Sequence, residues 1–232
     1  MIAVAGGKGG SGKTTTTLGL ARALSRRGAR VVAADADWDL PNLARLAAET
    51  ATDTGPSGLG SKVDHECART VRDAIGGTDP VRPDRTEPTV LGAPDAPRSV
   101  DALGTLGALD GTVPDGVPVL LDCPAGASAD AAAPLRVADR ALIATPLERA
   151  ALRDAAKTAA VACRLDCPPV GAVAVGETSA PDSVATLLDC PVLGAVPDGG
   201  PEPLSDSAVR SAYDDLARRL RETAAANEWR IA

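Results

Sequence analysis

A glycine-rich loop near the start of the chain ends in a lysine and two threonines, Gly7-Lys8-Gly9-Gly10-Ser11-Gly12-Lys13-Thr14-Thr15. It follows an apolar run at residues 2–5 and precedes an amphipathic helical pattern, which is the setting of a phosphate-binding loop. Glycines allow successive backbone N–H groups to face an anion, and the N-terminal end of the helix adds positive charge. In this arrangement Lys13 reaches the β- and γ-phosphates and the Thr14 hydroxyl ligates Mg²⁺. The loop therefore predicts a binding site for ATP and Mg²⁺.

Carboxylates follow two further apolar runs. Asp35 and Asp37 lie at the end of the run 31–35, and Asp122 ends the run 117–122. Because the carboxyl ends of parallel strands meet at one edge of a sheet, we expect these three side chains beside the glycine-rich loop. A carboxylate in that position holds the hydration shell of Mg²⁺ or positions an attacking water. The alternative is that Asp35 and Asp37 only cap a turn.

The loop and the carboxylates together resemble the motifs of one protein family. K-G-G-x-G-K-T, with its additional lysine at Lys8, is the deviant Walker A motif of the MinD/ParA ATPases. The resemblance covers residues 1–43 and 117–220. It includes Asp35-x-Asp37 with Asn42-Leu43 downstream, and Asp122-x-Pro124-Ala125-Gly126.

The resemblance implies a role for each matching residue. Lys8 would cross the interface of a homodimer formed with ATP and touch the partner's phosphates, Lys13 would bind the phosphates within its own subunit, and Asp37 would position the attacking water. The residues implied to lie at Mg²⁺ are Thr14, Asp35 and Asp122.

The resemblance is weaker in two places. Residues 44–116 match poorly and include loops rich in Gly, Pro, Asp and Thr, whereas in the family this interval contributes to dimerisation and partner recognition. After the apolar run 170–175, relatives offer an Asn to the adenine edge, but this chain has Gly176-Glu177-Thr178. We therefore expect backbone groups near Val196, Pro197 and Asp198 to contact the base, and we expect a protein partner that the sequence does not identify.

Short apolar runs alternate with helical patterns along the chain, which favours an α/β fold with a doubly wound, mostly parallel sheet flanked by helices in one domain, 1–232. The predicted strands are 2–5, 31–35, 89–91, 117–122, 141–145, 170–175 and 192–196. The predicted helices follow the glycine loop up to Arg27-Gly28 and then lie near 98–109, 128–136, 149–164, 183–188 and 207–225. The last helix has a narrow apolar stripe, typical of a packing helix rather than a membrane anchor: Val209, Tyr213, Leu216 and Leu220.

The composition limits the partners. The net charge is −7, with 20 Arg against 4 Lys and 23 Asp against 8 Glu, and this balance resembles the proteins of salt-accumulating halophiles. An acidic surface argues against an extended DNA footprint, and charge-driven lipid contact weakens because the Debye length falls to roughly 3 Å at about 1 M salt. Five scattered cysteines favour buried reduced thiols. We expect a cytoplasmic protein that reaches a membrane or a cell pole only through a partner, with at most weak lipid contact by the tail at 229–231.

The function indicated by these residues is that of a spatial or assembly switch, which dimerises around ATP, hydrolyses it slowly and thereby changes partner. Two alternatives stay open. One is a scaffold that nucleotide stabilises but that has little turnover. The other is a metabolic ATPase such as an amidating synthase, although the chain is short for the additional domain of those enzymes.

Overall fold

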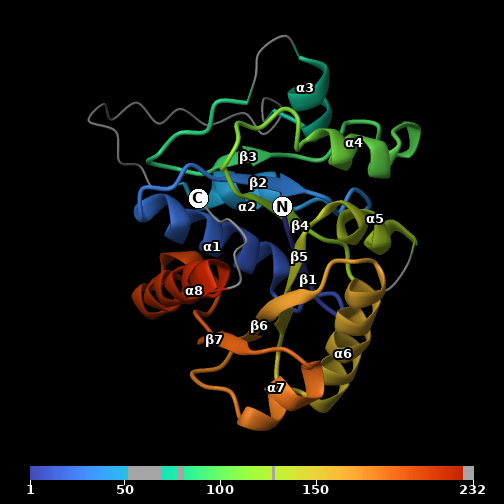
Figure 1. Ribbon diagram of the computed structural model, residues 1–232. Coiled ribbons are helices and arrows are strands. Elements are labelled where there is room, and N and C mark those ends of the chain that lie inside the picture. Colours follow the sequence, from blue (N-terminus) through green and yellow to red (C-terminus); the bar gives the residue numbers. More distant parts are fainter. Residues whose placement is uncertain (52–68, 78–80, 127–128, 227–232) are drawn as a thin grey trace.

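The computed structural model describes residues 1–51, 69–77, 81–126 and 129–226, and contains one seven-stranded sheet (Figure 1). Every strand pair in it is parallel, and the strand order is β3-β2-β4-β1-β5-β6-β7. The strands are β1 (Ile2–Ala5), β2 (Val32–Asp35), β3 (Thr89–Leu91), β4 (Val119–Asp122), β5 (Arg140–Thr145), β6 (Pro169–Val175) and β7 (Val192–Val196). The predicted α/β, doubly wound fold is therefore confirmed.

Helices cover both faces of the sheet. On one face lie α1 (Lys13–Arg26), α2 (Leu43–Glu49) and α8 (Ser207–Ala226). On the other lie α3 (Val71–Gly76), α4 (Ala102–Ala108), α5 (Ala129–Val137), α6 (Arg149–Arg164) and α7 (Asp182–Leu188). Two 3₁₀ turns, Pro97–Ser99 and Pro203–Ser205, precede α4 and α8.

The sheet is apolar on both faces because helices bury both. Along β1, Ile2 and Val4 face the core under α1 and α8, whereas Ala3 and Ala5 face the core under α5 and α6. Tyr213 of α8 is 1% exposed and packs against α1 at Gly19, where an added Cβ would lie 2.3 Å from the ring. Small residues in the core thus allow the helices to approach closely.

All seven predicted strands and the predicted helices are present, with ends that differ by a few residues. The four residues of the apolar stripe of α8 are buried, so its prediction as a packing helix is confirmed. Two short helices in the middle segment, α2 and α3, were not predicted. With seven and six residues they are too short to show a clear helical period, and α3 is held instead by a capping box between Thr70 and Asp73.

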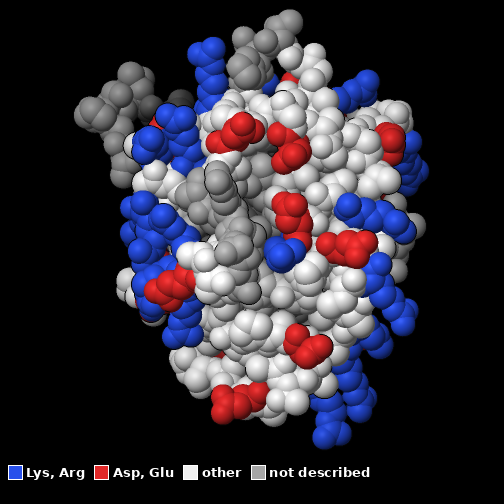
Figure 2. Space-filling model, viewed as in Figure 1, with Lys and Arg blue, Asp and Glu red and all other residues white. Residues whose placement is uncertain are grey.

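Charge is unevenly distributed on the surface. Figure 2 shows basic side chains gathered along the edge that α1 and α8 occupy, although the whole chain is acidic. Several of these arginines are paired with neighbouring acids, as Arg26 is with Asp214 and Arg218 is with Asp215 and Glu222. The expected acidic surface therefore does not extend to this edge.

Of the four cysteines that the structure describes, Cys123, Cys167 and Cys190 are buried and free, as expected, but Cys163 is exposed. It lies on the outer side of the last turn of α6, so the prediction of buried thiols is wrong for this residue. The fifth, Cys67, and the tail at 229–231 lie outside the described residues. None of the described helices is long and apolar enough to cross a membrane.

Candidate nucleotide-binding site

The glycine-rich loop connects the carboxyl end of β1 to the first turn of α1. Its last glycine, Gly12, is the residue before the helix and has a φ of 79°. This left-handed conformation favours glycine, and an added Cβ there would lie 2.7 Å from Val175 at the end of β6. The Gly12 carbonyl accepts the first helical hydrogen bond, from the N–H of Thr16 at 2.8 Å. The loop therefore places the N-terminus of α1 at the centre of the sheet edge.

Two polar side chains inside the loop have little to bind. The Lys13 side chain belongs to a residue only 7% exposed, and its ammonium group donates to the Lys8 carbonyl at a long 3.5 Å. The Ser11 hydroxyl is buried, and no partner accepts from it or donates to it in the described residues. A buried ammonium group and an unpaired hydroxyl are costly unless an anion supplies acceptors. The loop thus has the chemistry of a phosphate site.

The second lysine of the loop points in another direction. The Lys8 ammonium group forms an ion pair with Glu148 at 3.1 Å, at the residue that precedes α6. The Lys8 side chain is 42% exposed and that of Glu148 is 69% exposed, so this pair lies at the surface. Lys8 therefore does not share the interior of the loop with Lys13.

Asp122 lies directly behind the loop. Its carboxylate accepts a hydrogen bond from the Thr17 hydroxyl at 3.3 Å, and the nearby Thr14 side chain lowers its pKa. Asp35 is its neighbour in the β2–β4 ladder, so the two acids end adjacent strands side by side. Burial, reinforced by Asp35, raises the pKa of Asp122 to about 7. Positive charge at this point would favour the ionised carboxylate.

Asp35 is already engaged by the backbone. One of its oxygens accepts from the N–H of Asp37 at 3.0 Å, and the other accepts from the N–H groups of Asn42 and Leu43 at 3.1 and 3.0 Å. Burial raises its pKa to about 6, against the lowering effect of these three hydrogen bonds. Asp35 therefore holds both ends of the segment 37–42 and the start of α2, and its place at Mg²⁺ stays a prediction.

Asp37 begins this segment and is half-buried. Its carboxylate accepts from the N–H of Leu40 at 3.2 Å, so it forms part of a turn as well as facing the sheet edge. Trp38 donates its indole N–H to the Asp35 carbonyl at 2.9 Å, while Leu40 is 73% exposed at the tip of the segment. The structure thus shows the turn contact that the alternative expects of Asp37, and the role of Asp37 toward water stays a prediction.

The expected base-binding residues, Pro197 and Asp198, lie in the loop after β7, next to the loop after β6. These two loops meet, because the N–H groups of Gly176 and Glu177 both donate to the Val196 carbonyl, at 2.8 and 3.0 Å. Pro197 is half-buried there, whereas Asp198 is exposed and accepts from the N–H of Gly200 at 3.0 Å. The contact of Val175 with Gly12 places these loops next to the glycine-rich loop.

The donor set fits a magnesium-bound nucleotide. Mg²⁺ commonly takes one or two carboxylates together with water and phosphate oxygens. The described residues contain no group of three or more acids, cysteines or histidines that could hold a metal unaided. Asp122 and Thr14 could hold the cation, and Lys13, Ser11 and the backbone of the loop could hold the phosphates.

Sequence reasoning missed two residues at this edge. Glu148 has no motif of its own, and only the ion pair with Lys8 reveals it. Thr17, which bonds both the Lys13 carbonyl and Asp122, lies one turn beyond the motif. Its position four residues after Lys13 is the signal that could have found it, since residues four apart share a helix face.

Comparison with known proteins agrees with this geometry. Residues 2–224 match the CobQ/CobB/MinD/ParA nucleotide binding domain. Over 165 residues the chain is 34% identical to the chloroplastic homologue of the septum site-determining protein MinD of Arabidopsis thaliana. That match covers 67% of this chain and 48% of the plant protein, so the chain spans about half the length of that relative.

Two solved structures share the fold. One is the cell division ATPase MinD of Pyrococcus furiosus, with a TM-score of 0.75 and 24% identity over 95% of this chain and 98% of that one. The other is MinD of Pyrococcus horikoshii OT3 complexed with Mg-ADP, with a TM-score of 0.74 and 22% identity over 96% of each chain. Because the family match extends over nearly the whole chain and includes the loop and the acids that form the site, this protein belongs to the CobQ/CobB/MinD/ParA family of nucleotide-binding domains.

Proposed function

We propose that this protein is a positioning ATPase that forms a homodimer with Mg-ATP, hydrolyses it slowly and releases a partner afterwards. The observation that carries the proposal is that two lysines of one loop lie in different environments. Lys13 is buried inside the loop, where it can neutralise phosphate, whereas Lys8 lies at the surface, and among the described residues its ammonium group pairs with Glu148 alone. A surface lysine beside the phosphate site can exchange its exposed ion pair for a contact with a second subunit.

The chain's own residues account for binding. Lys13 and the backbone of the loop would hold the phosphates, and Thr14 and Asp122 would hold the cation, which would supply positive charge to the transferring phosphoryl group. Asp37 orients water at the same edge of the sheet. Asp35 acts through the segment 37–42, because its three hydrogen bonds keep Asp37 in place.

The exposed residues at this edge of the sheet would form the dimer interface. Lys8 leaves Glu148 and reaches the phosphates of the facing subunit, a change that costs little because an exposed ion pair contributes only about 0–1 kcal/mol. Leu40, exposed on the segment 37–42, gains burial in the same interface. Loss of the γ-phosphate removes the contact made by Lys8, so the dimer separates and the partner is released.

The molar mass of Asp37→Ala, measured by light scattering in molar KCl, tests the proposal. We expect a dimer with Mg-ATP and a monomer with Mg-ADP, because this variant binds ATP but cannot position water. Adding Lys8→Ala should abolish the dimer while ATP binding is retained, and Lys13→Ala should abolish binding itself.

A monomer with both nucleotides would contradict the proposal and favour a nucleotide-stabilised scaffold. Turnover by the unaltered protein that persists in Asp37→Ala would contradict the role of that residue. What the dimer positions is a separate question, for which a division site, a DNA locus and a surface assembly are the candidates.

A further inference from the structure

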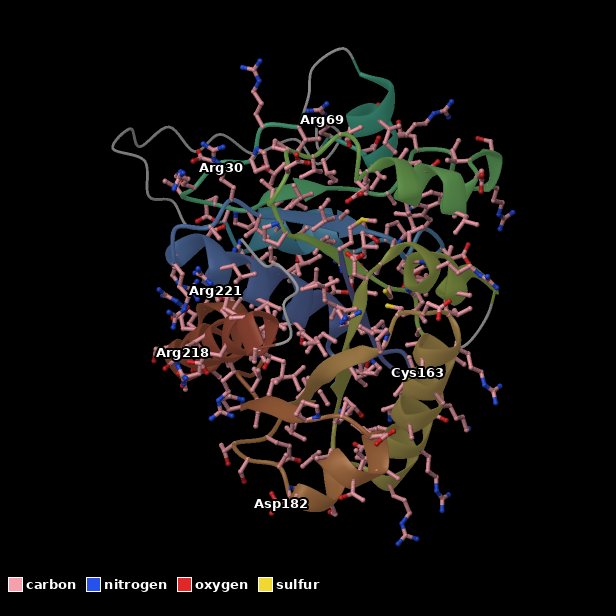
Figure 3. All side chains as sticks on the ribbon, viewed as in Figure 1. Arg30, Arg69, Cys163, Asp182, Arg218 and Arg221 are labelled. Carbon is pink, nitrogen blue, oxygen red and sulfur yellow. The ribbon has the colours of Figure 1, made fainter. Side chains whose placement is uncertain are left out.

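Four exposed arginines on the α1 and α8 side of the molecule form no ion pair with any acid that the structure describes. They are Arg27 at the end of α1, Arg30 in the loop that follows, Arg85 before β3 and Arg221 on α8. Figure 3 shows Arg30, Arg221 and Arg218 along one side of the molecule, where Figure 2 shows the gathering of basic side chains.

Contacts between three stretches of the chain bring these arginines to one surface. The Arg27 guanidinium group donates to the Asp214 carbonyl of α8 at 3.2 Å. That of Arg85 donates to the Gly28 carbonyl, just after α1, at 3.5 Å. Asp214 and Arg221 are two helical turns apart, so they share a face of α8 and lie about 10 Å apart along its axis. Residues 22–30, 84–87 and 214–222 therefore form one surface, the basic edge.

The acids of the basic edge are already engaged. The engaged pairs are Asp214 with Arg26, Asp215 and Glu222 with Arg218, and Glu87 with Arg22, while Asp84 accepts from the N–H groups of Arg85 and Thr86. Eight arginines stand against these five acids in the three stretches, and there is no lysine. The basic edge is therefore positive, although the whole chain has a net charge of −7.

Local structure explains only part of this charge. A cation at the end of a helix complements the helix dipole, which accounts for Arg27. Arg30 and Arg85 lie outside the helices, and Arg221 lies more than one turn before the end of α8 at Ala226. Like charges gathered on one surface repel one another, so an anionic ligand would be stabilised there.

We propose that the basic edge binds a short acidic segment of a partner protein, whose carboxylates pair with the free guanidinium groups. A guanidinium group can bind a carboxylate through two parallel hydrogen bonds, which persist at high salt better than long-range attraction does. Alternate residues of an extended segment project to the same side about 7 Å apart. Two or three alternate carboxylates therefore match the length of the edge along α8.

A long polyanion fits this edge less well than a short segment. The chain outside the basic edge is strongly acidic, so a nucleic acid or an anionic bilayer that extends beyond the edge would be repelled. Duplex DNA carries a charge every 1.7 Å or so, whereas acids interrupt the arginines of the basic edge. The edge also lies away from the nucleotide, because the 14 residues of α1, about 21 Å in length, separate it from the glycine-rich loop.

A defined peptide tests the proposal on the full chain without nucleotide, so the result does not depend on the proposed ATPase. The probe is a rhodamine-labelled peptide, Gly-Glu-Val-Glu-Thr-Glu-Val-Glu-Gly, and its control has Gln in place of every Glu. We expect fluorescence anisotropy at low salt to show at least about tenfold tighter binding of the acidic peptide, because the control forms no charge-assisted pairs. Bound peptide should also slow the modification of Arg30 and Arg221 by phenylglyoxal, measured by mass spectrometry.

Matched double variants locate the peptide. Arg30→Gln with Arg221→Gln should weaken the probe about tenfold or more, because two charge-assisted contacts are lost. Arg136→Gln with Arg164→Gln removes the same charge from exposed positions at the ends of α5 and α6, on the other face, and should leave its affinity unchanged.

Equal losses in the two double variants would overturn the proposal, as would equal binding of the Gln peptide or no binding at millimolar peptide. Tighter binding of a DNA duplex or of phosphatidylserine vesicles than of the peptide would also overturn it, since either would assign the basic edge to a phosphate-bearing surface. A nucleotide-free dimer that Arg30→Gln with Arg221→Gln dissociates would instead assign the edge to a second copy of this chain.

Discussion

The two lysines of the glycine-rich loop differ in what holds them, and this difference determines how each responds to substitution. Lys13 is fixed by the first turn of α1, and its ammonium group remains inside the loop. Lys8 is held by Glu148 alone in the described residues, at the surface. Changes at Lys13 should therefore affect binding, whereas changes around Lys8 should affect association.

If the proposed dimer is correct, Glu148→Gln should favour it. Removal of the charge releases Lys8 for the facing subunit, and because the homodimer breaks two such exposed pairs of about 0–1 kcal/mol each, the dimer should tighten by up to about thirtyfold. Sedimentation of the Asp37→Ala background with Mg-ATP measures the change. Glu222→Gln, which removes an exposed acid paired with Arg218, is the matched control and should have no effect. A weaker dimer after Glu148→Gln would place Glu148 in the interface instead.

Burial should determine which of the described cysteines react with a thiol reagent. Burial raises the pKa of Cys167 to about 12 and that of Cys190 to about 11, and it raises the pKa of Cys123 well above its ordinary value. Because the thiolate is the reactive form, iodoacetamide at pH 8 should modify Cys163 and leave these three intact. Peptide mass spectrometry reads the sites, and the denatured protein, in which all should react, is the control. Rapid modification of Cys167 in the native protein would contradict the described packing.

Hydrogen bonds connect α1 and α2, on one face of the sheet, with the candidate site. Arg22 of α1 donates to the Thr50 hydroxyl at 2.8 Å and to the Ala47 carbonyl at 3.4 Å, at the carboxyl end of α2. Asp35 accepts from the first N–H groups of the same helix. A carboxylate at the N-terminus of a helix and a guanidinium group at its C-terminus both complement the helix dipole. This arrangement connects the segment that carries Asp37 to the helix that follows the phosphate loop.

Gly19→Ala should disturb the packing of α1 against α8 and lower the free energy of unfolding. The added methyl group would lie 2.3 Å from the Tyr213 ring, and overpacking of this kind costs about 1–3 kcal/mol. Urea unfolding measures the loss. Gly107→Ala is the matched control, because the added Cβ on α4 would lie an ordinary 3.6 Å from Val137, and the change should stabilise the protein by up to about 1 kcal/mol through helix propensity. Equal effects of the two substitutions would show that the α1–α8 contact is looser than described.

The molecule as a whole should gain stability from its nucleotide. The site lies across the carboxyl ends of β1, β2 and β4, in the middle of the sheet, so a ligand bound there restrains both helical layers. Mg-ADP at about 100 times its dissociation constant should stabilise the folded state by about 2.7 kcal/mol. Thermal unfolding with and without Mg-ADP measures the shift, and Lys13→Ala should lose it. A full shift in Lys13→Ala would place the nucleotide outside the loop.

The sequence by itself determined the succession of the predicted strands and helices along the chain, the family and the position of the phosphate loop. These features depend on local patterns, namely apolar runs, helical periods and the glycine-lysine motif, which neighbouring residues along the chain specify. The same local information was insufficient for α2 and α3, because their stability comes from Asp35, Arg22 and a capping box rather than from periodicity.

Only the tertiary structure decided what each polar side chain binds. It showed that the Asp35 carboxylate accepts hydrogen bonds from three backbone N–H groups. It also showed that Lys8 forms an ion pair with Glu148, which lies 140 residues away in the chain. Arginines from three separate stretches of the chain meet at the basic edge in the same way. Contacts between residues far apart in sequence depend on how strands and helices pack, and no local spacing specifies them.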